Sequence, residues 1–125
     1  MYIRTDISKL AGRTIVKING GKDSDELVFI CSDNTEYKMY HSQECCESVT
    51  LDDICGDFSD LVGAPIVQAE EVQGEIPPPD GHVYTPESYT WTFYKLATAK
   101  GSVTLRWYGE SNGYYSESVD FVQIK

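Results

Sequence analysis

The chain has 125 residues and a formal net charge of −10, from 20 acidic and 10 basic side chains. This length suits one globular domain with a modest core, and we assign residues 1–125 to a single domain. The negative charge excludes simple electrostatic binding to the phosphates of an extended nucleic acid or to an anionic membrane surface.

The charge is unevenly distributed along the chain. Residues 39–94 contain eleven acidic side chains and no Lys or Arg, while the rest of the chain is close to neutral. Such an acidic segment is either a solvated surface that keeps the protein soluble or a patch that meets a basic partner.

Four cysteines stand at positions 31, 45, 46 and 55. The N-terminus lacks the pattern of a secretory signal, and no apolar run is long enough to span a membrane. We therefore expect a reducing cytoplasm and free thiols rather than disulfides. Cys31 follows an apolar run and is expected in the core.

The first third of the chain predicts a short helical turn followed by a meander. Residues 6–10 form the turn, with Thr5 or Asp6 as the cap. Residues 13–19, 26–32 and 35–41 then read as strands joined by short turns, which indicates three consecutive antiparallel strands.

The middle of the chain changes pattern. Residues 42–63 carry apolar side chains at helical spacing and acidic capping residues, which predicts one or two short helices. Residues 65–72 read as a strand, and residues 74–87 are rich in Pro and Gly, which predicts an exposed loop.

The last third shows the strongest alternation, which predicts three long strands within residues 89–124. We expect hairpin turns at residues 99–101 and 111–113, the second because it contains Asn-Gly. The whole chain therefore predicts an α+β fold: mainly one antiparallel sheet of six or seven strands, with one or two short helices inserted in the middle.

Residues 41–48 combine an imidazole, two thiols and two carboxylates. The candidate zinc ligands are His41, Cys45, Cys46 and Cys55, but adjacent cysteines point in different directions and no paired C-x-x-C motif is present. A cysteine of this segment with His41 as its base is also a candidate nucleophile. An acidic surrounding also disfavours the thiolate that a nucleophile requires. We predict no metal site, no cofactor and no catalytic residue here, and leave open whether His41, Cys45 and Cys46 are structural or functional.

Residues 104–117 concentrate groups suited to recognition. Arg106 is one of three arginines, and alternation places it beside Tyr108 on the face opposite Leu105. A planar guanidinium suits phosphate or carboxylate, and tyrosine rings offer stacking surfaces and hydroxyls. The alternative is an ordinary sheet surface, in which Arg106 pairs with Glu117 on the next strand.

Three segments carry a resemblance: "HSQECCESV", "DICGDFSDLVGAPIVQAEE" and "ESYTWTFYKLATAKGSVTLRWYGESNGYYSESV". Over roughly residues 13–121, the chain resembles a widespread family of small bacteriophage and prophage proteins. Through that group it is similar to the Thoeris anti-defence sponges, phage proteins that sequester a cyclic ADP-ribose-type signal made by bacterial TIR enzymes.

The resemblance implies a non-enzymatic phage protein, in the cytoplasm of the infected bacterial host, that binds a cyclic nucleotide immune signal without cleaving it. It implies that Arg106 holds phosphate, and that Asn112 and nearby tyrosines contact ribose and base. The candidate ligand-binding residues are Arg106, Tyr108, Asn112, Tyr114, Tyr94 and Arg13.

The scarcity of basic residues is a difficulty for this reading, because a diphosphate usually requires more than one cation. A pocket shared between subunits gathers an arginine from each, so we expect a homodimer or a larger homo-oligomer, with Arg13 and Lys95 as possible helpers.

The alternative function is an acidic phage inhibitor that binds a host defence protein directly. Its acidic segment, residues 39–94, would attract a basic nucleic-acid-binding surface. The carboxylates expected to carry this binding are those of Asp52, Asp53, Asp57 and Asp60.

Overall fold

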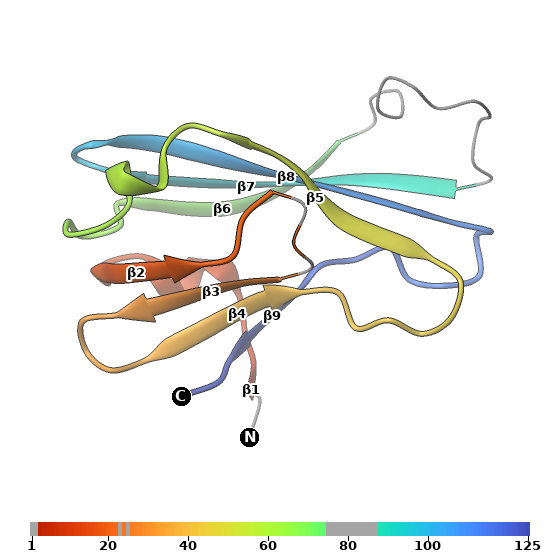
Figure 1. Ribbon diagram of the computed structural model, residues 1–125, viewed down its shortest axis with the longest axis horizontal. Helices are drawn as coiled ribbons and strands as arrows, with labels where there is room; N and C mark the ends of the chain where they lie inside the picture. The colour runs from red at the N-terminus through yellow and green to blue at the C-terminus, as the bar shows by residue number, and fades with distance from the viewer. Residues whose placement is uncertain (1–2, 23, 25, 75–87) are drawn as a thin grey trace.

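The computed structural model describes residues 3–22, 24, 26–74 and 88–125. Two antiparallel sheets pack face to face as a β-sandwich (Figure 1). The first sheet has the order β1-β9-β4-β3-β2 and consists of β1 (Ile3–Arg4), β2 (Ile15–Asn19), β3 (Glu26–Cys31), β4 (Glu36–Tyr40) and β9 (Asp120–Gln123). The second has the order β5-β8-β7-β6 and consists of β5 (Ser48–Cys55), β6 (Gln68–Gly74), β7 (Ser88–Thr98) and β8 (Gly101–Ser111).

The fold is therefore mainly antiparallel β, as predicted, but the α+β prediction with one sheet needs correction. The strands divide between two sheets, and the helical structure in the described residues is two 3-10 turns, η1 (Ile7–Leu10) and η2 (Phe58–Asp60). Each sheet has one apolar face, and these faces bury each other, which a single sheet with few helices could not achieve.

The first third of the chain folds as predicted. The Asp6 carboxylate caps η1 by accepting a hydrogen bond from the Ser8 amide at 2.9 Å, and β2, β3 and β4 form a meander. The turn between β3 and β4 places Asn34 at φ 69°, a left-handed conformation that asparagine tolerates.

The predicted helix around residue 52 is wrong, because these residues form β5. Leu51 and Ile54 both face the core although they are three residues apart. A β-bulge between Leu51 and Asp53 makes this possible, since it shifts the register against β8 by one residue. The apolar spacing that resembled a helix is the spacing of a bulged strand.

The turn after β7 is a hairpin, as predicted, but the Asn-Gly turn at residues 112–113 is not. β8 is already paired with β7 on one edge and β5 on the other, so the chain after β8 crosses to the first sheet, where β9 pairs with β1 and β4. The crossing chain lies close to Gly109, where a Cβ atom would stand 2.8 Å from the Glu117 carbonyl oxygen. Glycine at this position permits the crossing.

The core lies between the two sheets and contains large side chains from both. Trp107 of β8 and Met39 of β4 are both fully buried, and the Trp107 indole N–H points to the Met39 sulfur at 3.1 Å. The rings of Tyr37 in β4 and Phe121 in β9 stack with their centres 5.4 Å apart, a side-chain contact in addition to the backbone pairing of these strands.

Two further features concern the rest of the chain. The predicted loop at residues 74–87 begins at the end of β6, and from residue 75 onward it lies outside the described residues. No helix in the described part of the chain has the length and apolar character needed to cross a membrane.

Candidate functional site

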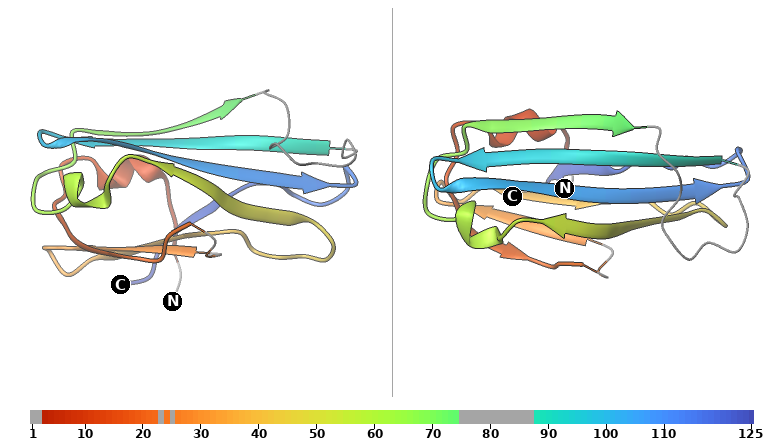
Figure 2. Two further views of the ribbon diagram at one scale, coloured as in Figure 1. Left: turned by 45° about the horizontal axis from the view of Figure 1, so that its top comes forward. Right: turned by 90° about the horizontal axis from the view of Figure 1, so that it is seen from above.

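The outer face of the β5-β8-β7-β6 sheet, which points away from the core, carries the candidate site. Figure 2 shows these four strands side by side. Along β8, Leu105 and Trp107 face the core, so Arg106 and Tyr108 lie on the outer face, as the alternation predicts. The outer face is formed by Ser48, Thr50, Asp53 and Cys55 of β5, Thr104, Arg106, Tyr108 and Glu110 of β8, Tyr89, Trp91, Phe93 and Lys95 of β7, and Glu70 and Val72 of β6.

Aromatic side chains of β7 support the Arg106 guanidinium. Phe93 stands directly opposite Arg106 in the register, and Trp91 stands opposite Tyr108. The guanidinium carbon lies 5.0 Å from the ring centre of Trp91 and 6.0 Å from that of Phe93. Cation–π contacts of this kind fix the plane of the guanidinium while leaving its N–H groups available.

Arg106 has a single ion-pair partner among the described residues, Asp53, with 3.8 Å between its Nη1 and the Asp53 Oδ2. This distance is too long for a direct hydrogen bond. The Arg106 side chain retains 32% of its exposure, so an anion can reach it. The alternative pairing of Arg106 with Glu117 is wrong, because Glu117 instead accepts hydrogen bonds from the hydroxyls of Thr90 and Ser111.

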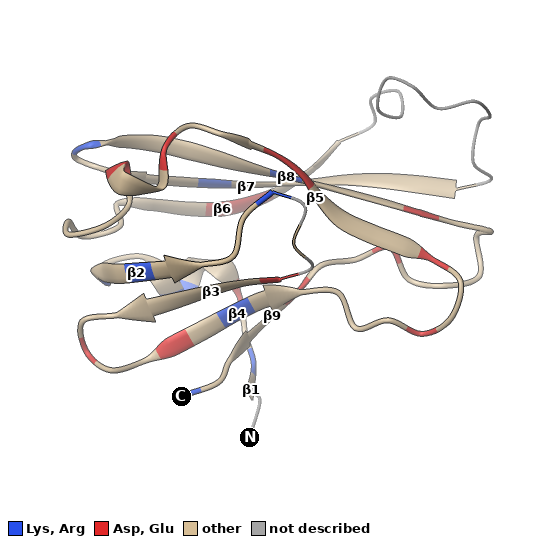
Figure 3. Ribbon diagram, in the orientation of Figure 1, with Lys and Arg blue, Asp and Glu red and all other residues tan. Residues whose placement is uncertain are grey.

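A second cation shares this face. Lys95 follows Phe93 by two residues on β7 and is exposed, and it stands between Thr104 of β8 and Glu70 of β6. Residues in this diagonal relation to Arg106 have Cα atoms about 7–8 Å apart, within reach of one small polyanion. Figure 3 shows basic positions in both β7 and β8.

Tyr108 is nearly buried beside Arg106. Its hydroxyl donates a hydrogen bond to Glu110 at 2.9 Å. Burial, together with this carboxylate, raises the pKa of Tyr108, so the phenol stays neutral. It therefore shapes the outer face and adds no negative charge there.

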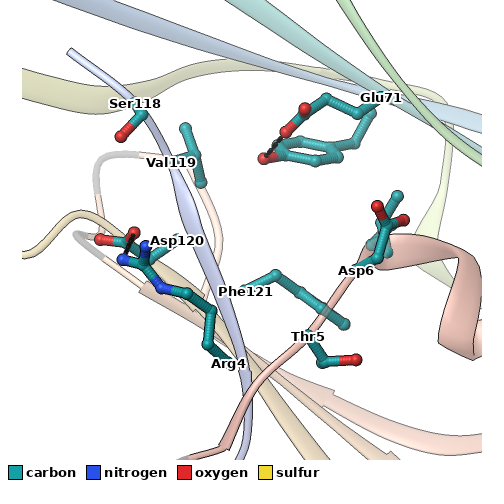
Figure 4. A pocket seen from close by; sticks show the side chains of 10 residues that line it. Arg4, Thr5, Asp6, Glu71, Ser118, Val119, Asp120 and Phe121 are labelled. Carbon is teal, nitrogen blue, oxygen red and sulfur yellow. Dashed lines mark hydrogen bonds and ion pairs between the residues drawn. The ribbon is translucent and has the colours of Figure 1, made fainter. Parts of the chain in front are cut away.

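Tyr94 of β7 lies on the opposite face of this sheet, between the two sheets. Its hydroxyl donates to Glu71 at 2.6 Å, and burial together with Glu71 raises the pKa of Tyr94. It lines a cavity of about 270 Å³ at the open side of the sandwich. Figure 4 shows this cavity with Asp6, Glu71 and the ion pair between Arg4 and Asp120 (2.6 Å).

Arg13 lies just before β2 of the first sheet, away from the outer face. It forms an ion pair with Asp33, donates to the Lys9 carbonyl oxygen at 2.9 Å, and covers the ring of Tyr37 at 5.6 Å. These contacts give Arg13 a structural role in holding the segment before β2 against the β3–β4 turn.

Asn112 and Tyr114 lie in the crossing chain after β8. The Asn112 side chain accepts a hydrogen bond from the Tyr114 amide at 2.9 Å, and Tyr114 is 83% exposed with its ring against Tyr115. Of the six residues predicted to bind ligand, only Arg106 and Tyr108 share the outer face. The sequence reasoning missed Trp91, Phe93 and Asp53 as their neighbours, although the alternation along β7 contained the signal for the first two.

The His41 imidazole and the Glu47 carboxylate form a buried pair that organises the loop between β4 and β5. The two groups are 2.7 Å apart, and the other ring nitrogen of His41 lies 2.6 Å from the Ser118 carbonyl oxygen. Glu47 also accepts hydrogen bonds from the amides of Glu44 (2.8 Å) and Cys45 (2.9 Å). The pair therefore ties this loop to the crossing chain, which is a structural role.

Cys45 and Cys46 are joined by a disulfide, so the prediction of free thiols is wrong for these two neighbours. Cys31 and Cys55 are free, and Cys31 is buried, as predicted. Within the described ranges, no group of three or more His, Cys, Asp or Glu side chains is placed to hold a metal ion.

Acid is expected to weaken the fold through Glu47. Burial opposes its ionisation, but the hydrogen bonds from His41 and from the Cys45 and Glu44 amides outweigh burial and lower the pKa of Glu47 from 4.5 to about 2. The stabilisation is complete above pH 4.5 and is lost as pH falls toward 2, because the unfolded chain takes up the proton first. Urea midpoints measured between pH 7 and pH 2.5 should fall more steeply in the wild type than in Glu47→Gln.

Glu26→Gln is the matched control, because Glu26 has a 53% exposed side chain on the first sheet. Its midpoints should follow those of the wild type at every pH. A Glu47 carboxyl resonance that titrates near pH 4.5 in the folded protein would contradict the assignment, whether or not the Gln variant folds.

The acidic side chains of the alternative function lie on β5 and around η2. Asp57 caps η2 by accepting from the Ser59 amide at 2.9 Å, and these hydrogen bonds lower the pKa of Asp57. The Asp60 carbonyl oxygen accepts a hydrogen bond from Thr98. Neutralising Asp52, Asp53, Asp57 and Asp60 together would therefore weaken the Asp57 cap of η2 as well as remove the charge, whereas the Thr98 hydrogen bond to the Asp60 backbone would remain.

Comparison with known proteins identifies one family. The family described as "Domain of unknown function (DUF7448)" matches residues 8–121, which include every strand except β1 and the end of β9. No curated protein and no solved structure matches the chain.

Proposed function

The chain belongs to the DUF7448 family, and on the geometry of its outer face we propose that it is a non-enzymatic protein that sequesters a cyclic nucleotide signal of the cyclic ADP-ribose type. One observation carries the proposal: Arg106 is held by two aromatic rings, is one-third exposed, and has its nearest described carboxylate beyond hydrogen-bond distance. The phage origin and the host cytoplasm belong to the same proposal and rest on the sequence resemblance.

The supported guanidinium suits a phosphate ligand. Arginine binds phosphate through two parallel N–H groups, and this geometry is specific when the guanidinium plane is fixed in advance. The rings of Trp91 and Phe93 provide that fixation here. The Arg106 side chain therefore loses little conformational entropy when the ligand binds.

Lys95 answers the difficulty that a diphosphate requires more than one cation. It lies on the same face as Arg106, so one protomer supplies two positive charges. The site then requires no arginine from a second subunit. A homodimer or larger homo-oligomer remains a separate proposal, which a mass measurement by light scattering tests.

Calorimetric titration of the protein with cyclic ADP-ribose isomers tests the proposed function. We expect saturable binding of at least one isomer, and recovery of the intact compound by mass spectrometry after heat denaturation. Absence of binding across the isomers, or recovery of a cleaved product, would contradict the proposal.

A further inference from the structure

Asp53 owes its place beside Arg106 to the bulge in β5. Without the bulge, alternation after Leu51 would turn Asp53 toward the core and Ile54 toward the outer face. The register shift places Asp53 opposite Arg106 and Ile54 opposite Leu105. Bulges often redirect a side chain at a functional position, and this one pairs a carboxylate with the supported guanidinium.

The two oxygens of Asp53 have different surroundings. Oδ1 accepts a hydrogen bond from the Ile54 amide at 2.9 Å, which fixes the carboxylate. Oδ2 faces Nη1 of Arg106 at 3.8 Å and the Cys55 sulfur at 3.9 Å, both long contacts, and the side chain is 41% exposed. The Asp53 carboxylate, an oriented acceptor, therefore lies next to the Arg106 guanidinium, an oriented donor, and the two groups form no direct hydrogen bond with each other.

We infer that Asp53 accepts a hydrogen bond from a ribose hydroxyl of the ligand whose phosphate lies on Arg106. This inference rests on the proposed function and narrows its ligand to phosphorylated compounds with a free ribose hydroxyl beside the phosphate.

The chemistry of the pair favours such a ligand over a simple polyanion. A phosphate is an anion at neutral pH, so the Asp53 carboxylate repels it. A hydroxyl donates to the carboxylate, while a phosphate on the same sugar accepts from Arg106. The carboxylate therefore favours a sugar phosphate, whose hydroxyl offsets the repulsion, over an inorganic phosphate of the same charge.

Substitution Asp53→Asn tests the inference, because asparagine retains an oxygen for the Ile54 amide and removes the charge. The probes are cyclic ADP-ribose, which carries free ribose hydroxyls, and inorganic pyrophosphate. We expect D53N to bind cyclic ADP-ribose about tenfold more weakly than the wild type, as for the loss of one charged hydrogen bond. Pyrophosphate should bind D53N as well as, or more tightly than, the wild type.

The outcomes separate the two proposals. Glu26→Gln, which removes the same charge from the other sheet, should bind both probes as the wild type does. If D53N binds cyclic ADP-ribose as tightly as the wild type or more tightly, Asp53 is only a competing anion, and the inference fails while the proposed function stands. If the wild type binds no cyclic ADP-ribose isomer, the proposed function fails and the ribose contact with it.

Discussion

Substitution Trp107→Ala is expected to lower the free energy of unfolding by about 3–5 kcal/mol, as for other large aromatic side chains removed from a core. Trp107 is fully buried at the centre of β8 and reaches Met39 in the other sheet. Its removal leaves a cavity between the two sheets. The strands of either sheet could move in to fill this cavity only by breaking hydrogen bonds to their neighbouring strands. Urea unfolding followed by circular dichroism measures the loss.

A loss of this size is a large part of the total stability of a small domain, so Trp107→Phe serves as a milder variant. Trp107→Phe should lose less free energy of unfolding than Trp107→Ala but more than Val16→Ala, because Val16 is 50% exposed. The account of the core is wrong if Trp107→Phe and Val16→Ala prove equally stable.

Substitution Arg106→Gln is expected to weaken binding of cyclic ADP-ribose by about 2–3 kcal/mol, or roughly 30–150-fold, with little change in stability. The substitution removes the fork of N–H donors that the Trp91 and Phe93 rings hold in place. The ion pair between Arg106 and Asp53 is partly exposed, with 3.8 Å between nitrogen and oxygen. Such pairs contribute about 0–1 kcal/mol to stability. Titration calorimetry and urea unfolding of the same preparation measure the two effects.

Arg106→Lys should bind with intermediate affinity, because it keeps the charge and loses the planar fork. Arg4→Gln is the matched control, since it removes an arginine from the other sheet whose side chain is 79% exposed. If Arg106→Gln and Arg4→Gln lose the same affinity for cyclic ADP-ribose, binding depends only on the net charge of the protein. That result would contradict a site on the outer face.

Much of the fold follows from local patterns along the chain. The meander of β2, β3 and β4 and the long hairpin of β7 and β8 depend on alternation and on short turns, which neighbouring residues determine. The division into two sheets depends instead on which edges are already paired. Residues 112–113 have a hairpin sequence, but β8 has no edge left for a third strand.

The candidate site was predictable only in part. Alternation places Arg106 and Tyr108 on one face, and the structure confirms this. The position of Asp53 on the outer face could not be predicted, because the β-bulge gives Leu51 and Ile54 the spacing of two positions on one face of a helix. Tyr94 was included for its ring, although the same alternation that exposes Arg106 turns Tyr94 toward the core.

The two tryptophans report on opposite faces of one sheet, since Trp91 contacts Arg106 on the outer face and Trp107 lies in the core. Nuclear magnetic resonance of the 15N-labelled protein resolves their two indole N–H signals. On addition of cyclic ADP-ribose, the account predicts that the Trp91 signal shifts to saturation while the Trp107 signal stays in place. A ligand that binds and leaves the Trp91 signal unchanged would contradict a site on the outer face.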